Sequence, residues 1–113
     1  MITLEKLYQL QNKLDCYIVG KKDNEIDHND KKFLNDRILA LFTEVGEFAN
    51  ATKCFKYWSN KPPENRIRLL DEYVDILHFY LSIGNTMGFT PQEVEDAYMN
   101  KNKVNYERQN NGY

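Results

Sequence analysis

The sequence contains few of the residues that interrupt or cross-link a polypeptide. It has two cysteines, three prolines and five glycines in 113 residues. The cysteines, Cys16 and Cys54, lie far apart and match no metal-binding or redox spacing, so we interpret both as buried free thiols.

Long hydrophobic runs and a strong charge imbalance are also missing. We recognise no signal peptide and no apolar stretch of membrane-spanning length, and the formal net charge is −2. The basic residues are scattered, apart from a small group of Lys101, Lys103 and Arg108. We therefore expect a soluble, cytoplasmic protein that binds neither a membrane nor DNA or RNA. The length fits one domain, residues 1–113, with a modest core.

Apolar residues recur at spacings of three and four, which predicts an all-α fold. The predicted helices cover residues 4–18, 32–57, 64–87 and 91–108. The polar stretch 20–32 is typical of a loop or a mobile lid, and Ser59 to Pro63 forms a second loop because two prolines cannot continue a helix.

Two further signals refine these helices. Gly88 ends the third helix, and Thr90, Pro91 and Glu93 form a good start signal for the fourth. The third helix is apolar round much of its circumference, which is typical of a central helix.

Two acidic pairs carry the strongest chemical signal. Glu44 and Glu47 lie one turn apart on the second helix, and Glu72 and Asp75 lie one turn apart on the third. Antiparallel helices joined by a short loop can face each other, so the four carboxylates can converge. Converging like charges are costly unless a cation neutralises them. Oxygen ligands without cysteine favour magnesium, manganese or calcium over zinc. Two solvated acidic helix faces are the alternative.

The position of these pairs round each helix can be estimated from the apolar stripes. We take Val45 and Tyr73 as the centres of the stripes on the second and third helices. Both acidic pairs then lie at a similar offset, about 130° round the helix from the stripe centre. The matching offsets favour a shared site over unrelated surface charges.

Several segments resemble the dimeric dUTPases of the all-α NTP pyrophosphatase superfamily, which also contains the MazG-type enzymes. They are residues 44–50 (EVGEFAN), 55–59 (FKYWS) and 71–79 (DEYVDILHF), with a C-terminal series from Lys101 to Tyr113. The resemblance implies a four-to-five-helix bundle that dimerises through helix packing. It also implies magnesium-dependent hydrolysis of dUTP, and often dUDP, to dUMP, with the partner subunit completing each site.

Carried over residue by residue, the resemblance implies a metal site, a phosphate and sugar site, and a base site. Mg²⁺, for which Mn²⁺ can substitute, would be held by Glu44, Glu47, Glu72 and Asp75, and Glu47 would orient or deprotonate the attacking water. The residues implied for the phosphates and sugar are Lys56, His78, Lys101, Asn105, Arg108 and Tyr113. The residues implied for the base are Gln11, Asp15 and Trp58. Without the resemblance, Trp58 and His78 are equally well explained as core residues, and Lys101 as part of a solvated helix face.

One position departs from the family pattern. The family usually has Asn where this chain has Asp15, and an ionised Asp can only accept hydrogen bonds. An acceptor suits the uracil N3–H and equally suits the cytosine amino group. The substrate therefore stays open between dUTP and dCTP or a modified nucleotide, the last two being typical of a MazG-like house-cleaning enzyme. A non-catalytic helical regulatory protein is the alternative from a different functional class.

Overall fold

The computed structural model describes residues 1–20 and 31–112, and within them the chain is helical with no strand. The helices are α1 (Leu4–Ile18), α2 (Lys31–Thr52), α3 (Arg66–Met87) and α4 (Pro91–Asn110). The all-α prediction is confirmed. Most of the predicted loop at 20–32, together with Tyr113, lies outside the described residues. Among the described helices, none combines the length and apolarity of a membrane span.

Side-chain caps begin three of the helices. Thr3 accepts a hydrogen bond from the Lys6 amide at the start of α1, and Asn65 accepts one from the Arg68 amide at the start of α3. Thr90 and Glu93 form a complete capping box on α4, as the sequence predicted. Each cap satisfies amides that the helix itself leaves without a partner.

The end of α2 differs from the prediction. The helix stops at Thr52, not Tyr57, because Lys53 adopts a left-handed backbone conformation with φ 59°. The Thr52 hydroxyl donates to the Ala49 carbonyl at 2.7 Å and accepts from the Cys54 amide at 3.3 Å. Threonine side chains compete in this way with the backbone bonds that would continue a helix. The α2–α3 loop is therefore longer than predicted, and α3 begins two residues later than predicted.

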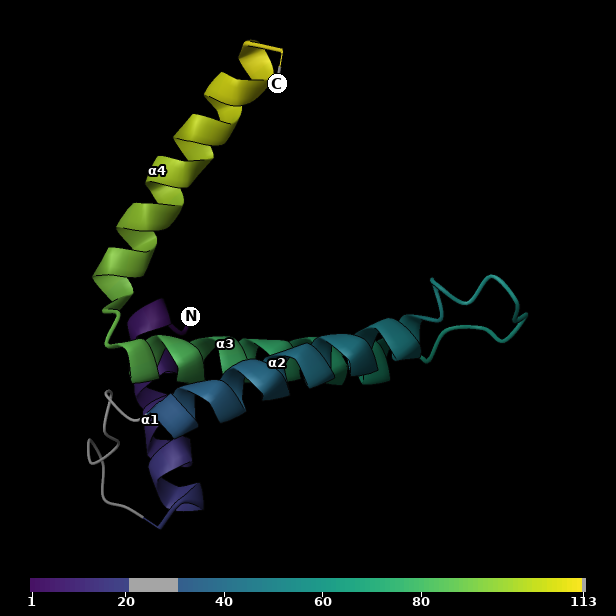
Figure 1. Ribbon diagram of the computed structural model, residues 1–113, viewed down its shortest axis with the longest axis horizontal. Helices are drawn as coiled ribbons and strands as arrows, with labels where there is room; N and C mark the ends of the chain where they lie inside the picture. The colour runs from purple at the N-terminus through teal and green to yellow at the C-terminus, as the bar shows by residue number, and fades with distance from the viewer. Residues whose placement is uncertain (21–30, 113) are drawn as a thin grey trace.

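The helices form a hairpin with two additions. α2 and α3 lie side by side along their length, α1 packs across α3, and α4 packs against α1 and projects away from the hairpin (Figure 1). The radius of gyration is 17.2 Å, whereas a compact domain of this length has about 13 Å. α3 is central in this arrangement, as its apolar character predicted.

The apolar core of a single chain is small. Its buried apolar members among the described residues are Tyr8, Cys16, Ala51 and Leu81. Val45 and Tyr73, which the sequence places at the centres of apolar stripes, are 45% and 60% exposed. Cys16 is buried as predicted, but the prediction that Cys54 is buried is wrong, because the chain turns at Lys53 and leaves Cys54 at the surface.

Candidate metal and phosphate site

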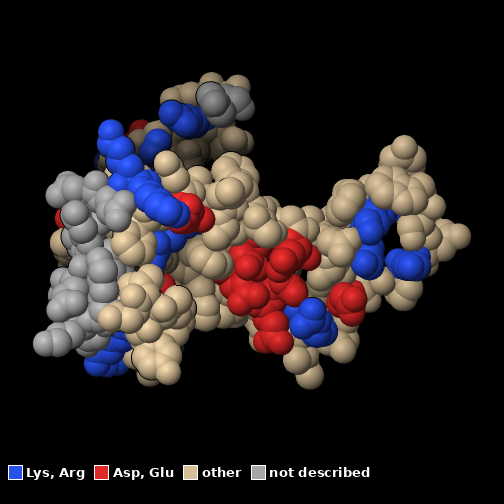
Figure 2. All heavy atoms as spheres, turned by 60° about the horizontal axis from the view of Figure 1, so that its bottom comes forward, with Lys and Arg blue, Asp and Glu red and all other residues tan. Residues whose placement is uncertain are grey.

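The face that joins α2 to α3 carries acidic side chains in its middle. Glu44 on α2 and Glu72 and Asp75 on α3 are each half-buried. Each offers a carboxylate oxygen, and these oxygens lie within 4.8 Å of one another. Figure 2 shows the resulting acidic patch on one face of the molecule. Helical geometry therefore brings together three of the four predicted metal ligands.

Without a cation, the carboxylates of this cluster repel one another. Burial, a hydrogen bond with Glu47 and the charges of Glu47, Asp75 and Glu72 raise the pKa of the Glu44 carboxyl above its ordinary value. One buried oxygen of Glu44, Oε2, and one of Glu72, Oε2, have no hydrogen-bond partner. Buried carboxylate oxygens without donors are costly. A hard divalent cation would satisfy both oxygens and the net negative charge, so the donor set fits the metal that the sequence predicts.

The fourth predicted ligand, Glu47, occupies a different position. It is exposed and lies beside Glu44 at the edge of the cluster, one turn further along α2. It also lines a polar hollow next to the cluster. Glu47 is therefore adjacent to the cluster without being one of its three convergent carboxylates.

The hollow beside Glu47 has a volume of about 320 Å³ and opens to solvent. Its lining combines three acidic residues, one cation, two neutral polar residues and two small residues. They are Glu47, Glu64, Glu72, Arg68, Thr43, Asn50, Gly46 and Ala51. The Arg68 Nη2 atom donates to Glu72 Oε1 at 3.1 Å. Sequence reasoning missed Arg68, although its position one turn before Glu72 on the same helix face was a usable signal.

A second polar group lies on the α1 side of the same helix seam. The Gln11 Nε2 atom donates to Asp15 Oδ1 at 2.9 Å, and the Ser82 hydroxyl donates to Asp15 Oδ2 at 2.6 Å. The Arg37 Nε atom donates to the Ser82 hydroxyl at 2.5 Å. Gln11 and Asp15, both predicted base-binding residues, are thus brought together but are buried within a protein network that joins three helices.

Arg37 and Ser82 were also missed by sequence reasoning. Each lies seven residues, or about 10 Å along a helix, from a carboxylate of the cluster: Arg37 from Glu44, and Ser82 from Asp75. A seven-residue spacing keeps side chains on one face. A search for polar residues at this spacing from the acidic pairs would have found both.

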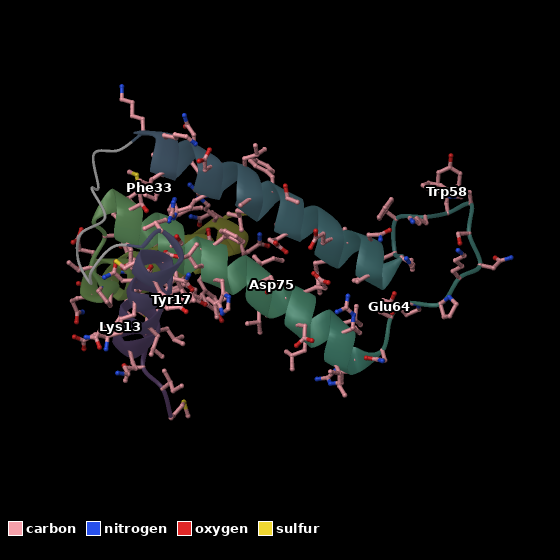
Figure 3. The ribbon with its side chains drawn as sticks, turned by 90° about the horizontal axis from the view of Figure 1, so that it is seen from below. Lys13, Tyr17, Phe33, Trp58, Glu64 and Asp75 are labelled. Carbon is pink, nitrogen blue, oxygen red and sulfur yellow. The ribbon has the colours of Figure 1, made fainter. Side chains whose placement is uncertain are left out.

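Trp58, a predicted base-binding residue, lies far from Gln11 and Asp15 within one chain. Trp58 is 64% exposed at the tip of the α2–α3 loop, at the opposite end of the hairpin from α1 (Figure 3). Its ring makes an edge contact with Tyr57, with centroids 5.1 Å apart. Lys56 lies in the same loop, and His78 is exposed on α3 one turn beyond Asp75. The structure therefore does not bring Trp58 to Gln11 and Asp15 in a single chain.

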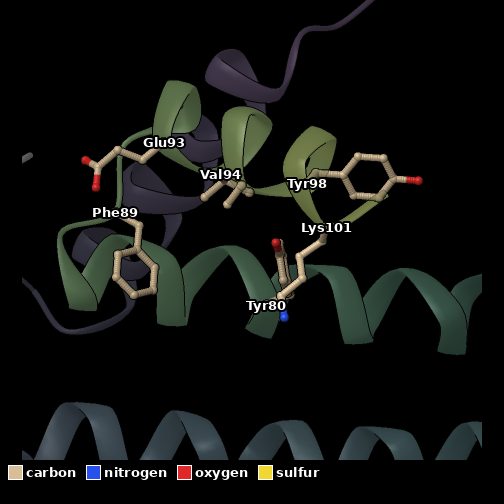
Figure 4. A pocket seen from close by; sticks show the side chains of 7 residues that line it. Tyr80, Phe89, Glu93, Val94, Tyr98 and Lys101 are labelled. Atoms are coloured by element: carbon tan, nitrogen blue, oxygen red, sulfur yellow. The ribbon is translucent and has the colours of Figure 1, made fainter. Parts of the chain in front are cut away.

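The C-terminal basic residues lie on the helix that projects from the hairpin. Lys101, Asn105 and Arg108 belong to α4, which packs against α1 alone among the described helices. Lys101 lines an apolar hollow of about 480 Å³ together with Tyr80 of α3 and Tyr98 of α4 (Figure 4). Tyr113 lies outside the described residues.

Comparisons with known proteins show which family the chain belongs to. A family model described as dUTPase matches residues 3–90 and 80–113. The chain is 31% identical over 119 residues to a dCTP pyrophosphatase of Enterobacteria phage T4, covering 87% of this chain and 70% of the phage protein. It is 25% identical over 101 residues to a dCTP pyrophosphatase of Enterobacteria phage LZ5, covering 75% of this chain and 59% of that protein. With its acidic α2–α3 seam and this coverage, the chain belongs to the all-α dUTPase family of nucleotide pyrophosphatases.

Proposed function

We propose that the chain hydrolyses a pyrimidine deoxynucleoside triphosphate to its monophosphate and pyrophosphate, with magnesium as cofactor. The observation that carries this proposal is the convergence of Glu44, Glu72 and Asp75 with two buried carboxylate oxygens that lack partners. Convergent carboxylates of this kind bind a hydrated divalent cation, and such a cation usually binds the phosphates of a nucleotide as well.

Glu44, Glu72 and Asp75 would hold the cation, and Glu47 would join them from the edge of the cluster. When bound, a divalent cation neutralises phosphate charge and makes water a better nucleophile near neutral pH. The charge and oxygen donors of the site suit Mg²⁺ and Mn²⁺ equally. The protein's own contribution is then to position the phosphates and to remove a proton.

Glu47 would act as the general base in this reaction. Its carboxylate is exposed beside the cluster, so it can accept a proton from water while the other carboxylates hold the cation. Water would add to a phosphorus atom, pyrophosphate would leave, and Glu47 would take the proton. Glu47→Gln should lower turnover by roughly 10²- to 10⁴-fold and leave the protein folded, with a melting temperature no lower than that of the wild type. An unchanged rate would remove Glu47 from the mechanism and would favour a different base.

The base of the substrate is the finer part of the proposal. The matched relatives from phages T4 and LZ5 are both dCTP pyrophosphatases. The ionised carboxylate of Asp15 can only accept hydrogen bonds, whereas the Asn that is usual in the family would also donate one. We therefore place dCTP first and dUTP second, the latter because the matching family model is described as dUTPase. Gln11, Asp15 and Trp58 are the proposed base-binding residues, and His78 and Lys56 the proposed sugar and phosphate contacts.

A homodimer would explain why these residues are dispersed in one chain. Val45 and Tyr73 lie on apolar faces that a single chain leaves exposed, and a hairpin with so few buried apolar side chains has little to stabilise it alone. A second copy would cover these faces and could bring its own Lys101 and Arg108 to the carboxylates. Sedimentation of the purified protein at micromolar concentration tests this proposal, and a stable monomer would contradict it.

The activity itself is tested with a panel of nucleotides. Pyrophosphate release would be measured with dCTP, dUTP, dTTP, dATP and the corresponding ribonucleotides, with Mg²⁺ and with EDTA. We expect kcat/KM for dCTP and dUTP to exceed that for dTTP and the purines at least tenfold, and EDTA to abolish release. If dTTP matches dCTP and dUTP, the proposed substrate class is wrong. If no nucleotide is hydrolysed, the non-catalytic alternative gains support.

A further inference from the structure

The lining of the polar hollow beside the carboxylates includes one cationic side chain, Arg68, to which no function has been assigned so far. We propose that Arg68 binds the outer phosphates of the substrate, and that it leaves Glu72 to do so once a divalent cation occupies the carboxylates. This inference rests on the proposed function, because it assigns the phosphate tail of the nucleotide to one side of the same site.

The geometry of Arg68 supports an exchange of partners. Only its Nη2 atom is engaged with Glu72, at 3.1 Å, and its side chain is 56% exposed whereas that of Glu72 is 13% exposed. An ion pair this open to solvent contributes little to stability. The guanidinium has five donors in a planar fork that matches two phosphate oxygens at once. Arg68 is therefore held near the cluster by a weak bond that a phosphate can replace.

The shape of the hollow points to a ligand that approaches the backbone of α2. Gly46 lines the hollow in the middle of α2, and a Cβ added there would meet no other atom within 4 Å. Glycine in the middle of a helix is less stable than alanine. No packing neighbour within the chain requires the small residue, so the space above Gly46 is open to a ligand. Thr43 and Asn50 provide polar side chains along the same wall.

The charges of the hollow explain why phosphate would enter only with a cation. Glu47, Glu64 and Glu72 outnumber Arg68 in its lining, so an anion alone is repelled. A cation on the carboxylates would take over Glu72, which removes the attraction that holds Arg68 in place. Arg68, the cationic side chain in the lining of this hollow, would then be available to bind the phosphates. Lys101 and Arg108 lie on α4, which does not pack against this part of the same chain.

Product inhibition distinguishes a role of Arg68 in binding the outer phosphates from a general effect of its substitution on the enzyme. Inorganic pyrophosphate with Mg²⁺ would be used as the inhibitor of dCTP or dUTP hydrolysis, and the nucleoside monophosphate as a second inhibitor. Arg68→Ala should weaken inhibition by pyrophosphate roughly 10- to 100-fold, the range expected for a hydrogen bond to a charged group. Inhibition by the monophosphate should stay within about twofold. Arg68→Lys should give an intermediate effect because it keeps the charge and loses the fork.

Arg66→Ala is the matched control. Arg66 is an exposed arginine in the same first turn of α3 and does not line the hollow. If Arg68→Ala and Arg66→Ala give the same pyrophosphate inhibition, the inference is wrong while the proposed function stands. If the wild-type protein hydrolyses no nucleotide, the proposed function fails. Pyrophosphate binding with Mg²⁺, measured by calorimetry, then decides the inference alone. Arg68→Ala should bind pyrophosphate more weakly than the wild type and Arg66→Ala, and equal binding would overturn the inference.

Binding of Mg²⁺ without nucleotide tests the exchange itself. Because Arg68 competes with the cation for Glu72, Arg68→Ala should bind Mg²⁺ as tightly as the wild type or up to about tenfold more tightly in calorimetry. Loss of Mg²⁺ binding would show that Arg68 positions Glu72 for the metal, which would overturn the exchange. Gly46→Ala provides an independent check on the hollow. It should weaken pyrophosphate inhibition while raising the melting temperature, and unchanged inhibition would contradict the placement of the phosphates above Gly46.

Discussion

Neutralising one carboxylate of the cluster should stabilise the metal-free protein. In Glu44→Gln, the side chain keeps its size and loses the charge that faces Glu72 and Asp75. At 4.8 Å, the upper limit of the separation between these oxygens, two like charges repel by about 0.9 kcal/mol in water and by about 3.5 kcal/mol at an effective dielectric constant of 20. The cluster is half-buried and Arg68 partly compensates Glu72. We expect a net gain of about 1–3 kcal/mol.

The assay is thermal unfolding followed by circular dichroism in EDTA at pH 8 and at fixed protein concentration. A gain of this size corresponds to a melting temperature roughly 4–12 °C above that of the wild type. Mg²⁺ at a hundredfold excess over its Kd should stabilise the wild type by about 2.7 kcal/mol. It should stabilise Glu44→Gln much less. Glu107→Gln is the control, because Glu107 is an exposed carboxylate on α4 and should leave both values unchanged.

The difference in melting temperature between Glu44→Gln and the wild type should grow as pH rises. The pKa of Glu44 is raised in the folded protein above its ordinary value of 4.5, so the folded state binds its proton more tightly than the unfolded state does. The stability that comes from this proton is fully present below pH 4.5 and is lost as pH rises through the raised pKa. Glu44→Gln and the wild type should therefore melt together at pH 4 and diverge as pH rises. A variant that melts below the wild type at pH 8, or that keeps the full Mg²⁺ response, would refute the reasoning.

Two further substitutions test the packing of α1 on the hairpin, and both would be measured by urea unfolding. Gly84→Ala would place a Cβ 2.6 Å from Cε1 of the Tyr8 ring. We expect the free energy of unfolding to fall by about 1–3 kcal/mol, offset by up to about 1 kcal/mol because alanine favours the helix more than glycine does. Stability at or above that of the wild type would contradict the close approach. Ser82→Ala would remove the hydroxyl that joins Asp15 to Arg37, so we expect a loss of about 1–3 kcal/mol; a change below about 0.5 kcal/mol would show that the buried network rearranges without cost.

Local signals in the sequence predicted most of the secondary structure. The Thr90 capping box and the left-handed Gly88 fix the boundary between α3 and α4, because each depends only on residues within one turn. The end of α2 was harder to predict. Lys53 adopts a left-handed conformation that lysine rarely favours, and the hydrogen bonds of Thr52 that accompany it cannot be read from hydrophobic periodicity.

The orientation of the hairpin could not be derived from the apolar stripes, and the reason bears on how the site is built. The periodicity rule assumes that the most apolar face of a helix is buried within its own chain. Here the face of α2 that meets α3 is centred on Glu44, whereas Val45, 100° away round the helix, is 45% exposed. The matching offset of the two acidic pairs was therefore the informative part of the pattern, because it brings the carboxylates to one seam whichever face is buried.

A seam that is acidic in its middle is a weak interface for a lone hairpin, and a metal ion together with a second copy of the chain would supply the stability that it lacks. Metal binding, assembly and folding should then be coupled, so Mg²⁺ should raise the melting temperature and shift the sedimentation profile of the same sample together.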